Sequence, residues 1–590
     1  MTLPATSYQG PVPLTGGLEA EIEDDTHLVG SKAQAIRIGR IRLLTVALVF
    51  AVSFSVLAGR LIELTVIREP GQSLASTAAA PTKSTAGRAD IVDRNGILLA
   101  TNLLTASLYA DARSVPDAAK AARRVVGVLP ELSLAAVQER LSSNRAFVWL
   151  KRNLTPSQQA AVNGLGIPGL HFRDEQRRVY PHGSLESHVL GFTDVDGNGI
   201  SGMEKYFDQE MRDRGPRGQA LQVSLDVRVQ HVLRDELSEA MGRFRTKGAA
   251  GLVLNANTGE ILGLVSLPDF DPNHPSAAPA LARFNRATKG VYELGSVFKV
   301  LTVAMALDSG ATKIRGGYDA TKPIRVARYT IRDSHAKKRW LSVPEILIYS
   351  SNIGAAKMAL DVGRDGQRRY LDHFGLLGRP SLELPEVGMP MTPARWGDIS
   401  TMTAAYGHGL AVSPVQFASA FAAMVNGGVL LPATLIKRKP GERTVGVQVI
   451  SERTSNQLRR LLRAVVEKGT GRKAQAPGYL VGGKTGTAEK AGAGGYRRKA
   501  LISSFVAAFP MTAPKYVVYL LLDEPQGDVE THGYATAGWT AAPLTSRVVS
   551  RIAPILGVRP QDNEAAPVQR AMALPLYSRV DSRGRNIAVN

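Results

Sequence analysis

The 590-residue chain contains no cysteine, so it can form neither a disulfide bond nor a metal site with thiolate ligands. Aromatic residues make up only 6% of it, and we find no motif that interleaves them with basic residues, as nucleic-acid-binding proteins do. The formal net charge of +21 therefore suits an anionic membrane surface or polymer better than nucleic acid, although a general arginine bias would also produce it. We expect no cofactor, no metal and no nucleic-acid partner.

Hydrophobic residues make up 44% of the chain and charged residues 21%, which is typical of a folded protein, and its length exceeds one ordinary domain. Residues 1–40 begin with a stretch that lacks a hydrophobic period, and we predict that they form a disordered cytoplasmic tail. Residues 558–590 are predicted to be a C-terminal tail. The folded part of the chain is expected between these two ends.

Charged residues are absent from Leu43 to Gly59, and apolar residues continue beyond Arg60. Because a membrane span needs about 20 mostly apolar residues, residues 41–64 are predicted to be a transmembrane anchor. A cleaved signal peptide is the alternative, but its cleavage site would directly follow the apolar core, whereas Ala78-Ala79-Ala80 lies far beyond it. Basic residues gather before the span, which places the N-terminus in the cytoplasm and the rest of the chain outside it.

Residues 65–220 carry no catalytic constellation and are predicted to form a packing or docking domain. Residues 70–87, rich in Ser, Thr, Ala and Pro, read as a linker. Asp93 to Gly96 gives a tight turn between two apolar segments, which predicts a hairpin. Helical periodicity follows over residues 115–165, with these candidates for its core: Leu129, Leu132, Leu134, Val137 and Leu141.

A second domain is predicted for residues 221–557. Asp226 is a candidate N-cap for a helix with apolar spacing over Val227 to Met241. Two apolar runs, Gly251 to Leu254 and Ile261 to Val265, are joined by a turn sequence. This arrangement predicts a β-hairpin.

Ser296 and Lys299 lie near the start of a run with helical character, directly after the turn residue Gly295. Residues three apart share a helix face, so the Lys299 amine can reach the Ser296 hydroxyl. Three apolar neighbours would exclude water from this amine: Val297, Phe298 and Val300. Since desolvation lowers the pKa of a lysine, a neutral Lys299 could take the serine proton, and the pair predicts a nucleophile with its own base.

Ser-x-x-Lys is a weak pattern by itself, and the chain holds a second copy from Ser334 to Lys337. That copy lies in a charged run, which is typical of solvated surface. Nothing in this run would exclude water from the Lys337 amine, so we expect Ser334 to be unreactive.

Ser350 and Asn352 precede another helical pattern and are two residues apart, so both side chains could point into one cleft. Helix capping is the alternative, because serine and asparagine often cap helices. The sequence alone leaves the two interpretations open.

Gly482 and Gly483 precede Lys484-Thr485-Gly486-Thr487, a stretch that occurs once in the chain. Glycines at a strand edge allow close backbone approach, and the lysine and threonines supply a cation and hydroxyl donors. The phosphate-binding pattern G-x-x-x-x-G-K-T also fits from Gly478. However, its apolar residues would lie inside the loop and no helix follows Thr485, so we favour a strand lining a cleft.

Ser-x-x-Lys, Ser-x-Asn and Lys-Thr-Gly in this order are similar to the signature of penicillin-binding proteins and serine β-lactamases. The flanks resemble class B penicillin-binding proteins, above all the division-specific D,D-transpeptidases of the FtsI type, over about residues 41–557. Leu294 stands where many members have proline, and Ala89 replaces a frequent glycine. The flanking segments that carry the resemblance are Gly87 to Gly96, Arg178 to Pro181, Gly202 to Tyr206, Asn285 to Ala287, Tyr406 to Gly409, Ser413 to Gln416, Asn426 to Gly428 and Ala541 to Pro543.

The resemblance implies an α/β transpeptidase fold, an antiparallel sheet with helices on both faces, preceded by an elongated pedestal domain and one N-terminal membrane helix. It implies an enzyme that cross-links peptidoglycan stem peptides during septal wall synthesis and is acylated by β-lactams. No glycosyltransferase domain is recognisable before residue 220, so the protein is expected to be monofunctional. The implied partners are stem peptides with a D-Ala-D-Ala donor and an amine acceptor, the cytoplasmic membrane, and divisome proteins that include a polytopic glycosyltransferase.

The resemblance also implies roles for individual residues. Ser296 would attack the donor carbonyl, with Lys299 as its favoured base. Ser350 would relay a proton to the departing D-Ala, and Asn352 would hold the substrate amide. Lys484 would support the positive field of the cleft.

The remaining residues of the third motif would bind substrate. Thr485 and Thr487 would hold the terminal carboxylate, and Gly486 lies between them. Backbone N–H groups of Ser296 and Thr487 would form the oxyanion hole.

Other functions remain open at this point. The same chemistry could serve wall elongation instead of division, or the protein could be a penicillin-acylating sensor or a scaffold for division partners. A β-lactamase-like hydrolase is disfavoured, because we find no Glu-x-x-Leu-Asn element to activate a deacylating water.

Overall fold

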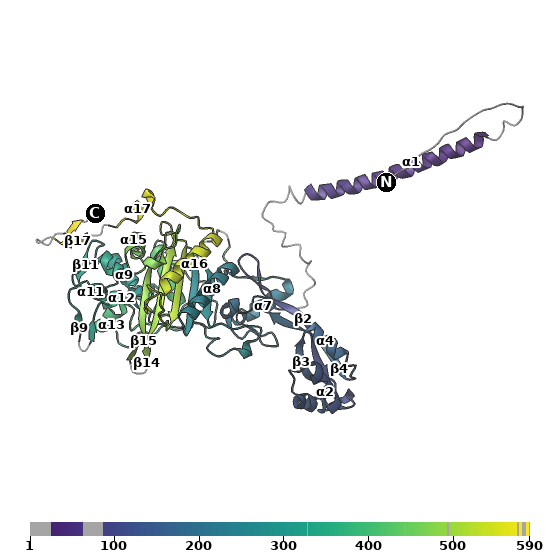
Figure 1. The fold of residues 1–590 in the computed structure, drawn as a ribbon, viewed down its shortest axis with the longest axis horizontal. Helices are drawn as coiled ribbons and strands as arrows, with labels where there is room; N and C mark the ends of the chain where they lie inside the picture. The colour runs from purple at the N-terminus through teal and green to yellow at the C-terminus, as the bar shows by residue number, and fades with distance from the viewer. Residues whose placement is uncertain are drawn as a thin grey trace, which may run out of the picture. The chain divides into compact units, whose positions relative to one another are not determined.

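The computed structural model describes residues 25–62, 87–326, 329–439, 441–442, 444–492, 495–574, 577–580 and 586–588. The chain divides into two compact units, Met1–Lys83 and Ser84–Asn590, which are described separately (Figure 1). Most of the predicted linker at residues 70–87 lies outside the described residues.

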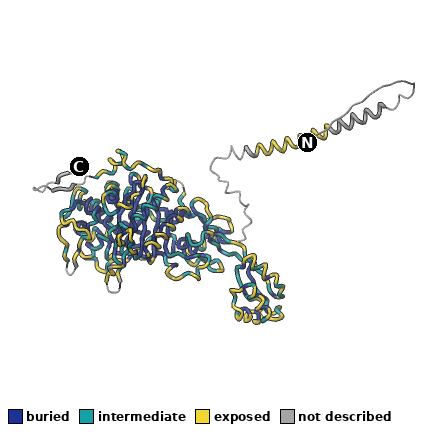
Figure 2. The backbone as a smooth tube through the Cα atoms, viewed as in Figure 1, coloured by how far each residue is buried: buried dark blue, intermediate teal, exposed yellow. Residues whose placement is uncertain are grey.

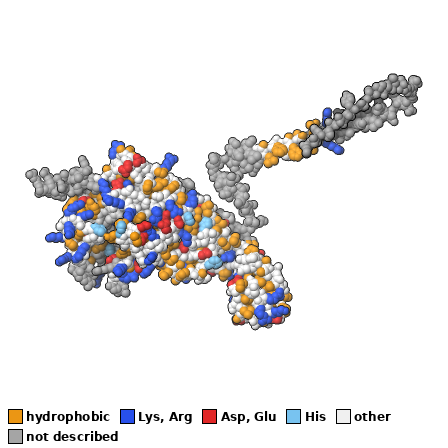
Figure 3. Space-filling view, viewed as in Figure 1, with side chains coloured by type: hydrophobic (Ala, Val, Ile, Leu, Met, Phe, Trp, Pro, Cys, Tyr) orange, Lys and Arg blue, Asp and Glu red, His pale blue; other side chains and the backbone are white. Residues whose placement is uncertain are grey.

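The first unit contains the helix α1, Asp25–Ile62. Its segment Arg40–Gly59 has the length and apolar composition to cross a membrane, with a mean hydropathy of 2.3. Hydrophobic side chains cover this segment (Figure 3). The prediction of disorder for residues 1–40 is wrong for residues 25–40, because the helix begins at Asp25. This stretch has no proline and many good helix formers, so nothing in it interrupts a helix that continues from the apolar segment.

The N-terminal part of the second unit contains a five-stranded sheet in the order β3-β2-β1-β5, with β4 also paired to β2. The predicted hairpin is confirmed, because Val92 pairs with Leu98 across the turn. The N-terminal sheet continues past the predicted boundary at residue 220, since β5 pairs in parallel with β1. The strands are β1 Ile91–Val92, β2 Leu98–Ala110, β3 Val148–Leu154, β4 Leu170–Val179 and β5 Leu221–Gln222.

Three helices cover this sheet: α2 Ala118–Val128, α3 Leu134–Leu141 and α4 Pro156–Asn163. These helices confirm in part the helical periodicity predicted for residues 115–165; strand β3 lies within that range and was not predicted. Leu129, Val137 and Leu141 are fully buried, as predicted. Leu134 is 42% exposed, because it is the first residue of α3 and lies at the end of its apolar face.

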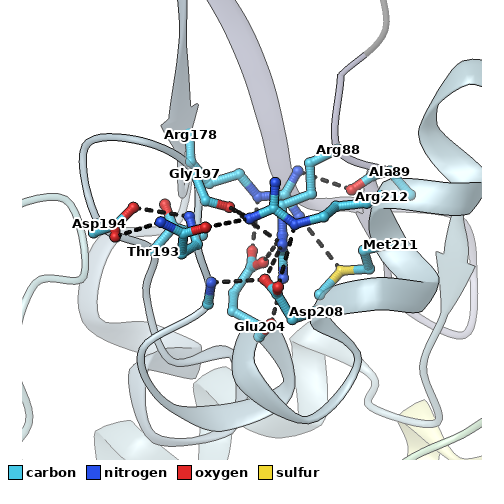
Figure 4. A network of polar contacts seen from close by, with 12 residues as sticks. Arg88, Ala89, Arg178, Thr193, Asp194, Gly197, Glu204, Asp208, Met211 and Arg212 are labelled. Atoms are coloured by element: carbon cyan, nitrogen blue, oxygen red, sulfur yellow. Dashed lines mark hydrogen bonds and ion pairs between the residues drawn. The ribbon is translucent and has the colours of Figure 1, made fainter.

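A network of buried charges joins three segments of this domain that are distant in the sequence (Figure 4). Glu204 is fully buried and accepts from Arg88 and, at 2.7 Å, from Arg178 Nε. Arg88 also binds Asp208 at 2.5 Å, and Arg178 donates to the Ala89 carbonyl at 2.8 Å. The network therefore holds together the segments at 87–96, 178–181 and 202–206.

The C-terminal part contains a five-stranded sheet in the order β14-β15-β16-β6-β7, in which all neighbours are antiparallel. The predicted hairpin is confirmed as β6 and β7. β14 forms one edge of the sheet, so among the described residues one of its sides has no strand neighbour. The strands are β6 Gly248–Asn255, β7 Ile261–Leu267, β14 Gly482–Gly492, β15 Gly495–Phe509 and β16 Tyr516–Asp523.

Helices cover both faces of this sheet, as expected (Figure 1). One face packs against α8, Val227–Arg243, which Asp226 caps as predicted, and against α16, Ala541–Ile555. The other face packs against α14, Pro414–Val425, and α15, Glu452–Lys468.

Alternate residues of the central strands belong to two hydrophobic clusters. Val517, Tyr519 and Leu521 pack on one face of β16, while Val518, Leu520 and Leu522 pack on the other. The sheet is therefore buried on both sides and lies inside the molecule (Figure 2). Such a sheet is a rigid base for a site built on its edge strand.

The predicted C-terminal tail contains a short helix, α17 Ala566–Met572. Val568 and Met572 pack against the hydrophobic core, so this part of the tail is attached to the domain.

Candidate active site

Ser296 lies in a 3₁₀ turn, Gly295–Phe298, which runs directly into the helix α9, Lys299–Asp308. Gly295 has a φ of +62°, and a Cβ atom there would lie 2.5 Å from the Thr487 carbonyl oxygen. Any other residue would push the turn away from β14. The glycine thus brings Ser296 against the edge strand.

The predicted contact between Ser296 and Lys299 is present, with 2.8 Å between Oγ and Nζ. Lys299 Nζ also lies 2.7 Å from the Ser350 carbonyl oxygen and 3.0 Å from Ser350 Oγ. The lysine is fully buried, although Ser296 remains half-buried. The amine is thus surrounded by oxygen acceptors, and in the part of the chain that the structure describes no carboxylate is among its hydrogen-bond partners.

Burial holds the pKa of Lys299 well below its usual value, as the sequence predicted. The nearby charge of Lys484 lowers this pKa further, and the negative charge of Asp333 opposes the shift. A lysine in this environment loses its proton more readily than an exposed lysine, and its neutral amine can accept a proton from a hydroxyl.

Ser350 has a φ of +60°, an uncommon conformation for a residue with a side chain. It lies between α10, Val343–Ile348, and α11, Asn352–Val362. Ser351 caps α11, since its Oγ accepts from the Gly354 N–H at 3.0 Å. The capping role therefore falls to Ser351, and the Ser350 hydroxyl faces the two lysines.

Asn352 does not join the serine and lysine groups directly. Its Nδ2 donates to the Arg332 carbonyl at 2.9 Å, and its side chain is partly exposed. The structure thus brings Ser350 to Lys299 and holds Asn352 beside Arg332.

Lys484 is the second fully buried lysine of the site. Its Nζ lies 3.1 Å from Ser350 Oγ and 3.1 Å from Thr485 Oγ1. Burial lowers the pKa of Lys484 to about 7. The alternative of a phosphate-binding loop does not hold, because Lys484 and Thr485 lie within β14 and pair with Val506 and Phe505.

The rest of β14 is shaped by the turn at Ser296 and by neighbouring loops. A Cβ atom at Gly486 would lie 2.5 Å from the Leu294 carbonyl oxygen, so only glycine fits there. Thr487 Oγ1 accepts from the Ala537 N–H at 3.1 Å. Thr485 Oγ1 lies 2.7 Å from Thr470 Oγ1, a contact that the sequence analysis missed because no motif marks Thr470.

The second Ser-x-x-Lys copy is on the surface, as predicted. Ser334 and Lys337 are both exposed. Lys337 Nζ lies 4.6 Å from the centroid of the Tyr349 ring, so the lysine contacts an aromatic side chain rather than its serine.

Comparisons with known proteins agree with this fold. Residues 249–548 match the penicillin binding protein transpeptidase domain, and residues 83–226 match the penicillin-binding protein dimerisation domain. The chain therefore belongs to the penicillin-binding proteins and is an enzyme of their transpeptidase class.

The relatives narrow the class to class B penicillin-binding proteins of the FtsI type. A probable peptidoglycan D,D-transpeptidase FtsI from Caulobacter vibrioides is 42% identical over 483 residues, 80% of this chain and 82% of that protein. The peptidoglycan D,D-transpeptidase FtsI of Escherichia coli is 29% identical and covers 80% of this chain and 84% of its own length. The transpeptidase domain of Burkholderia pseudomallei penicillin-binding protein 3 is 31% identical with a TM-score of 0.52, covering 58% of this chain and 98% of the solved one.

Proposed function

We propose that this protein is a peptidoglycan D,D-transpeptidase that cross-links stem peptides during septal wall synthesis through a serine acyl-enzyme. The observation that carries the proposal is the buried Lys299 amine, 2.8 Å from Ser296 Oγ and without a carboxylate partner. A buried cation whose hydrogen-bond partners are all neutral is costly to keep, whereas a neutral amine there is a ready base.

Acylation starts when Ser296 Oγ attacks the carbonyl carbon of the penultimate D-Ala of the donor stem, and Lys299 takes the serine proton. Backbone N–H groups of Ser296 and Thr487 stabilise the oxyanion, and one such donor typically contributes about 10²–10³-fold in rate. Collapse of the intermediate breaks the peptide bond, and Ser350 relays a proton from the lysines to the departing D-Ala amine. Ser350 Oγ is in reach of both amines, at 3.0 Å from Lys299 and 3.1 Å from Lys484.

The edge strand β14 binds the donor. An extended peptide can pair with the open side of an edge strand through main-chain hydrogen bonds. The positive charge of Lys484 and the hydroxyls of Thr485 and Thr487 hold the terminal carboxylate, while Asn352 binds a backbone amide of the donor. Penicillin carries a carboxylate in the corresponding place and acylates the same serine.

The second half-reaction returns the enzyme to its starting state. The amine of a neighbouring stem attacks the acyl carbonyl carbon, a new amide bond forms, and the bond to Ser296 Oγ breaks. The amine loses a proton in this step and Ser296 regains one, so Lys299 carries the proton between them.

The division role and the membrane topology rest on FtsI relatives and on α1. We propose that Arg40–Gly59 anchors the chain in the cytoplasmic membrane, with the catalytic domain outside and divisome proteins, including a polytopic glycosyltransferase, as partners. A reporter that works only outside the cytoplasm should be active when fused after residue 590 and inactive at residue 20. A fluorescent fusion should gather at mid-cell; side-wall placement would point to elongation.

Labelling with a tagged penicillin tests the chemistry. The label should attach to Ser296 alone, located by mass spectrometry of the digested adduct, and Ser296→Ala should abolish it with thermal stability nearly unchanged. Attachment at Ser334, the serine of the exposed copy, would overturn the assignment.

A further inference from the structure

The segment that follows strand β10, Tyr329–Ile331, contacts both sides of Ser350. Lys337 lies against the ring of Tyr349, the residue before Ser350. The Arg332 carbonyl accepts from the side chain of Asn352, two residues after Ser350. The exposed run that carries the second Ser-x-x-Lys copy is therefore part of the support of the second motif.

Asp333 is the centre of this support. Its carboxylate accepts three hydrogen bonds from consecutive residues: Ser351 Oγ at 2.7 Å, the Asn352 N–H at 2.6 Å and the Ile353 N–H at 3.0 Å. The two N–H groups belong to the first turn of α11 and have no partner within the helix. A carboxylate satisfies both and is favoured by the positive end of the helix dipole.

The conformation of Ser350 needs such support. A non-glycine residue at a positive φ is strained and persists only where surrounding contacts hold it. In this conformation the Ser350 carbonyl and hydroxyl both reach Lys299, at 2.7 and 3.0 Å. Asp333 binds Ser351, Asn352 and Ile353, the three residues that follow Ser350, and so holds the turn in this arrangement.

We propose that Asp333 is a positioning residue of the transpeptidase reaction: it holds the Ser350-Ser351-Asn352 turn against Lys299, and its negative charge acts on that lysine. The inference rests on the proposed function, since it assumes that Lys299 is the base. Asp333 does not touch the reacting atoms and acts through Ser351, Asn352 and Lys299.

The charges around Lys299 determine the sign of the electrostatic effect. Lys484 faces it from β14 and lowers its pKa, while Asp333 raises it, and His408 lies within electrostatic reach from the loop after α13, Asp398–Ala404. Removing the negative charge of Asp333 therefore lowers the pKa of Lys299 further. The neutral, basic form of the lysine should then persist to lower pH.

The test compares two variants of the full-length protein in acylation by a fluorescent penicillin, measured as a second-order rate across pH. Asp333→Ala removes the three hydrogen bonds that hold the Ser350 turn. It should lower the acylation rate by about 10²-fold, since misplacement of a catalytic group by about 1 Å can have that effect. Asp333→Asn keeps one acceptor oxygen, which can still accept from the Asn352 and Ile353 N–H groups, so this variant should retain most of the acylation rate. Its rate should decline at a lower pH than that of the wild type as the medium is acidified.

Asp319→Asn is the matched control, because Asp319 is an exposed aspartate that caps a turn at Thr321 and contacts no residue of the site. It should change neither the rate nor the pH profile. A folded Asp333→Ala protein with the wild-type rate would overturn the positioning role. An Asp333→Asn profile that coincides with the wild-type profile would overturn the effect on Lys299, and this outcome does not depend on whether the alanine variant folds.

Failure of this inference can be told apart from failure of the proposed function. If Ser296→Ala still reacts with penicillin, the function itself is wrong. If Ser296→Ala is inert while both Asp333 variants behave as the wild type, only the role of Asp333 is wrong.

Discussion

Two regions of the molecule each bury a pair of basic side chains, and they treat the charge in opposite ways. In the N-terminal domain, Arg88 and Arg178 share the carboxylate of Glu204, and the three side chains are 5%, 3% and 0% exposed. In the C-terminal domain, Lys299 and Lys484 are equally buried, and the one hydrogen-bond partner that they share among the described residues is the hydroxyl of Ser350.

The difference follows from the chemistry of the two side chains. A guanidinium stays charged at any working pH, so burying it demands a carboxylate partner. A lysine amine can release its proton instead, and burial without a counter-charge lowers its pKa toward the range where it transfers protons. In the N-terminal domain the shared carboxylate joins segments that are distant in the sequence, whereas in the C-terminal domain the two buried lysines without such a partner have lowered pKa values.

Replacing Lys299 by arginine should have the largest effect. Arginine keeps the charge but remains protonated, so it cannot act as base, and loss of a general base typically costs about 10²–10⁴-fold in rate. The acylation rate by penicillin measures this loss, and the exposed Lys515→Arg is the control with no expected change. Substantial acylation by Lys299→Arg would show that the lysine supplies only charge and would erase the contrast between the two regions.

Glu204→Gln tests the other side of the comparison. Removing the carboxylate leaves two buried guanidinium groups without their shared partner, which should destabilise the domain by about 3–5 kcal/mol. Denaturant unfolding measures this, with Glu210→Gln as control, because Glu210 forms a more exposed pair with Arg214 whose loss costs about 1 kcal/mol or less. Acylation of the molecules that remain folded should be unchanged; a specific loss of acylation would place the network in the catalytic machinery.

The pH dependence of acylation should separate the two lysines. With a pKa of about 7, Lys484 is protonated below that pH and neutral above it, so attraction of the penicillin carboxylate should weaken as pH rises through about 7. The second-order rate of acylation by penicillin should therefore decline as pH rises through about 7. In Lys484→Arg, which stays charged, this alkaline decline should disappear, and its persistence would assign the decline to another group.

Thr485→Val should have the smallest effect of the four. It removes a hydroxyl 3.1 Å from Lys484 Nζ and 2.7 Å from Thr470 Oγ1 while keeping the side-chain volume. The loss of one hydrogen bond of about 1 kcal/mol corresponds to roughly a fivefold to tenfold slower acylation. An unchanged rate would mean that the Thr485 hydroxyl does not take part in binding the carboxylate.

Much of the fold and site was predictable where the signal is local. The contact between Ser296 and Lys299 follows from helical spacing, and the hairpins at residues 93–96 and 251–265 follow from turn residues between apolar runs. The cap at Asp226 is local in the same sense. In each case the residues that determine the geometry are within a few positions of one another.

For the unpredicted strand and the unpredicted side-chain contacts, the deciding partner is distant in the sequence. β3 was hidden in a region predicted as helical, since its strand character depends on pairing with β2, some forty residues earlier. Asp333 carries no motif and reaches its partners across 18 to 20 residues. Arg88 and Glu204 are 116 residues apart, so no local pattern could reveal their contact.

The central sheet has a consequence for how the chain folds. β6 at residues 248–255 pairs with β16 at residues 516–523, so two neighbouring inner strands of one sheet are synthesised early and late in the domain. Pairings with such a long sequence separation are slow to form, because the entropy cost of closing a large loop precedes the stabilising contacts between the strands. The edge strand β14 reaches the sheet only through β15, which itself pairs with β16. Ser296 therefore meets Lys484 and Thr487 late, after the chain has emerged past Asp523, and the candidate site of a growing chain stays incomplete until β16 is in place.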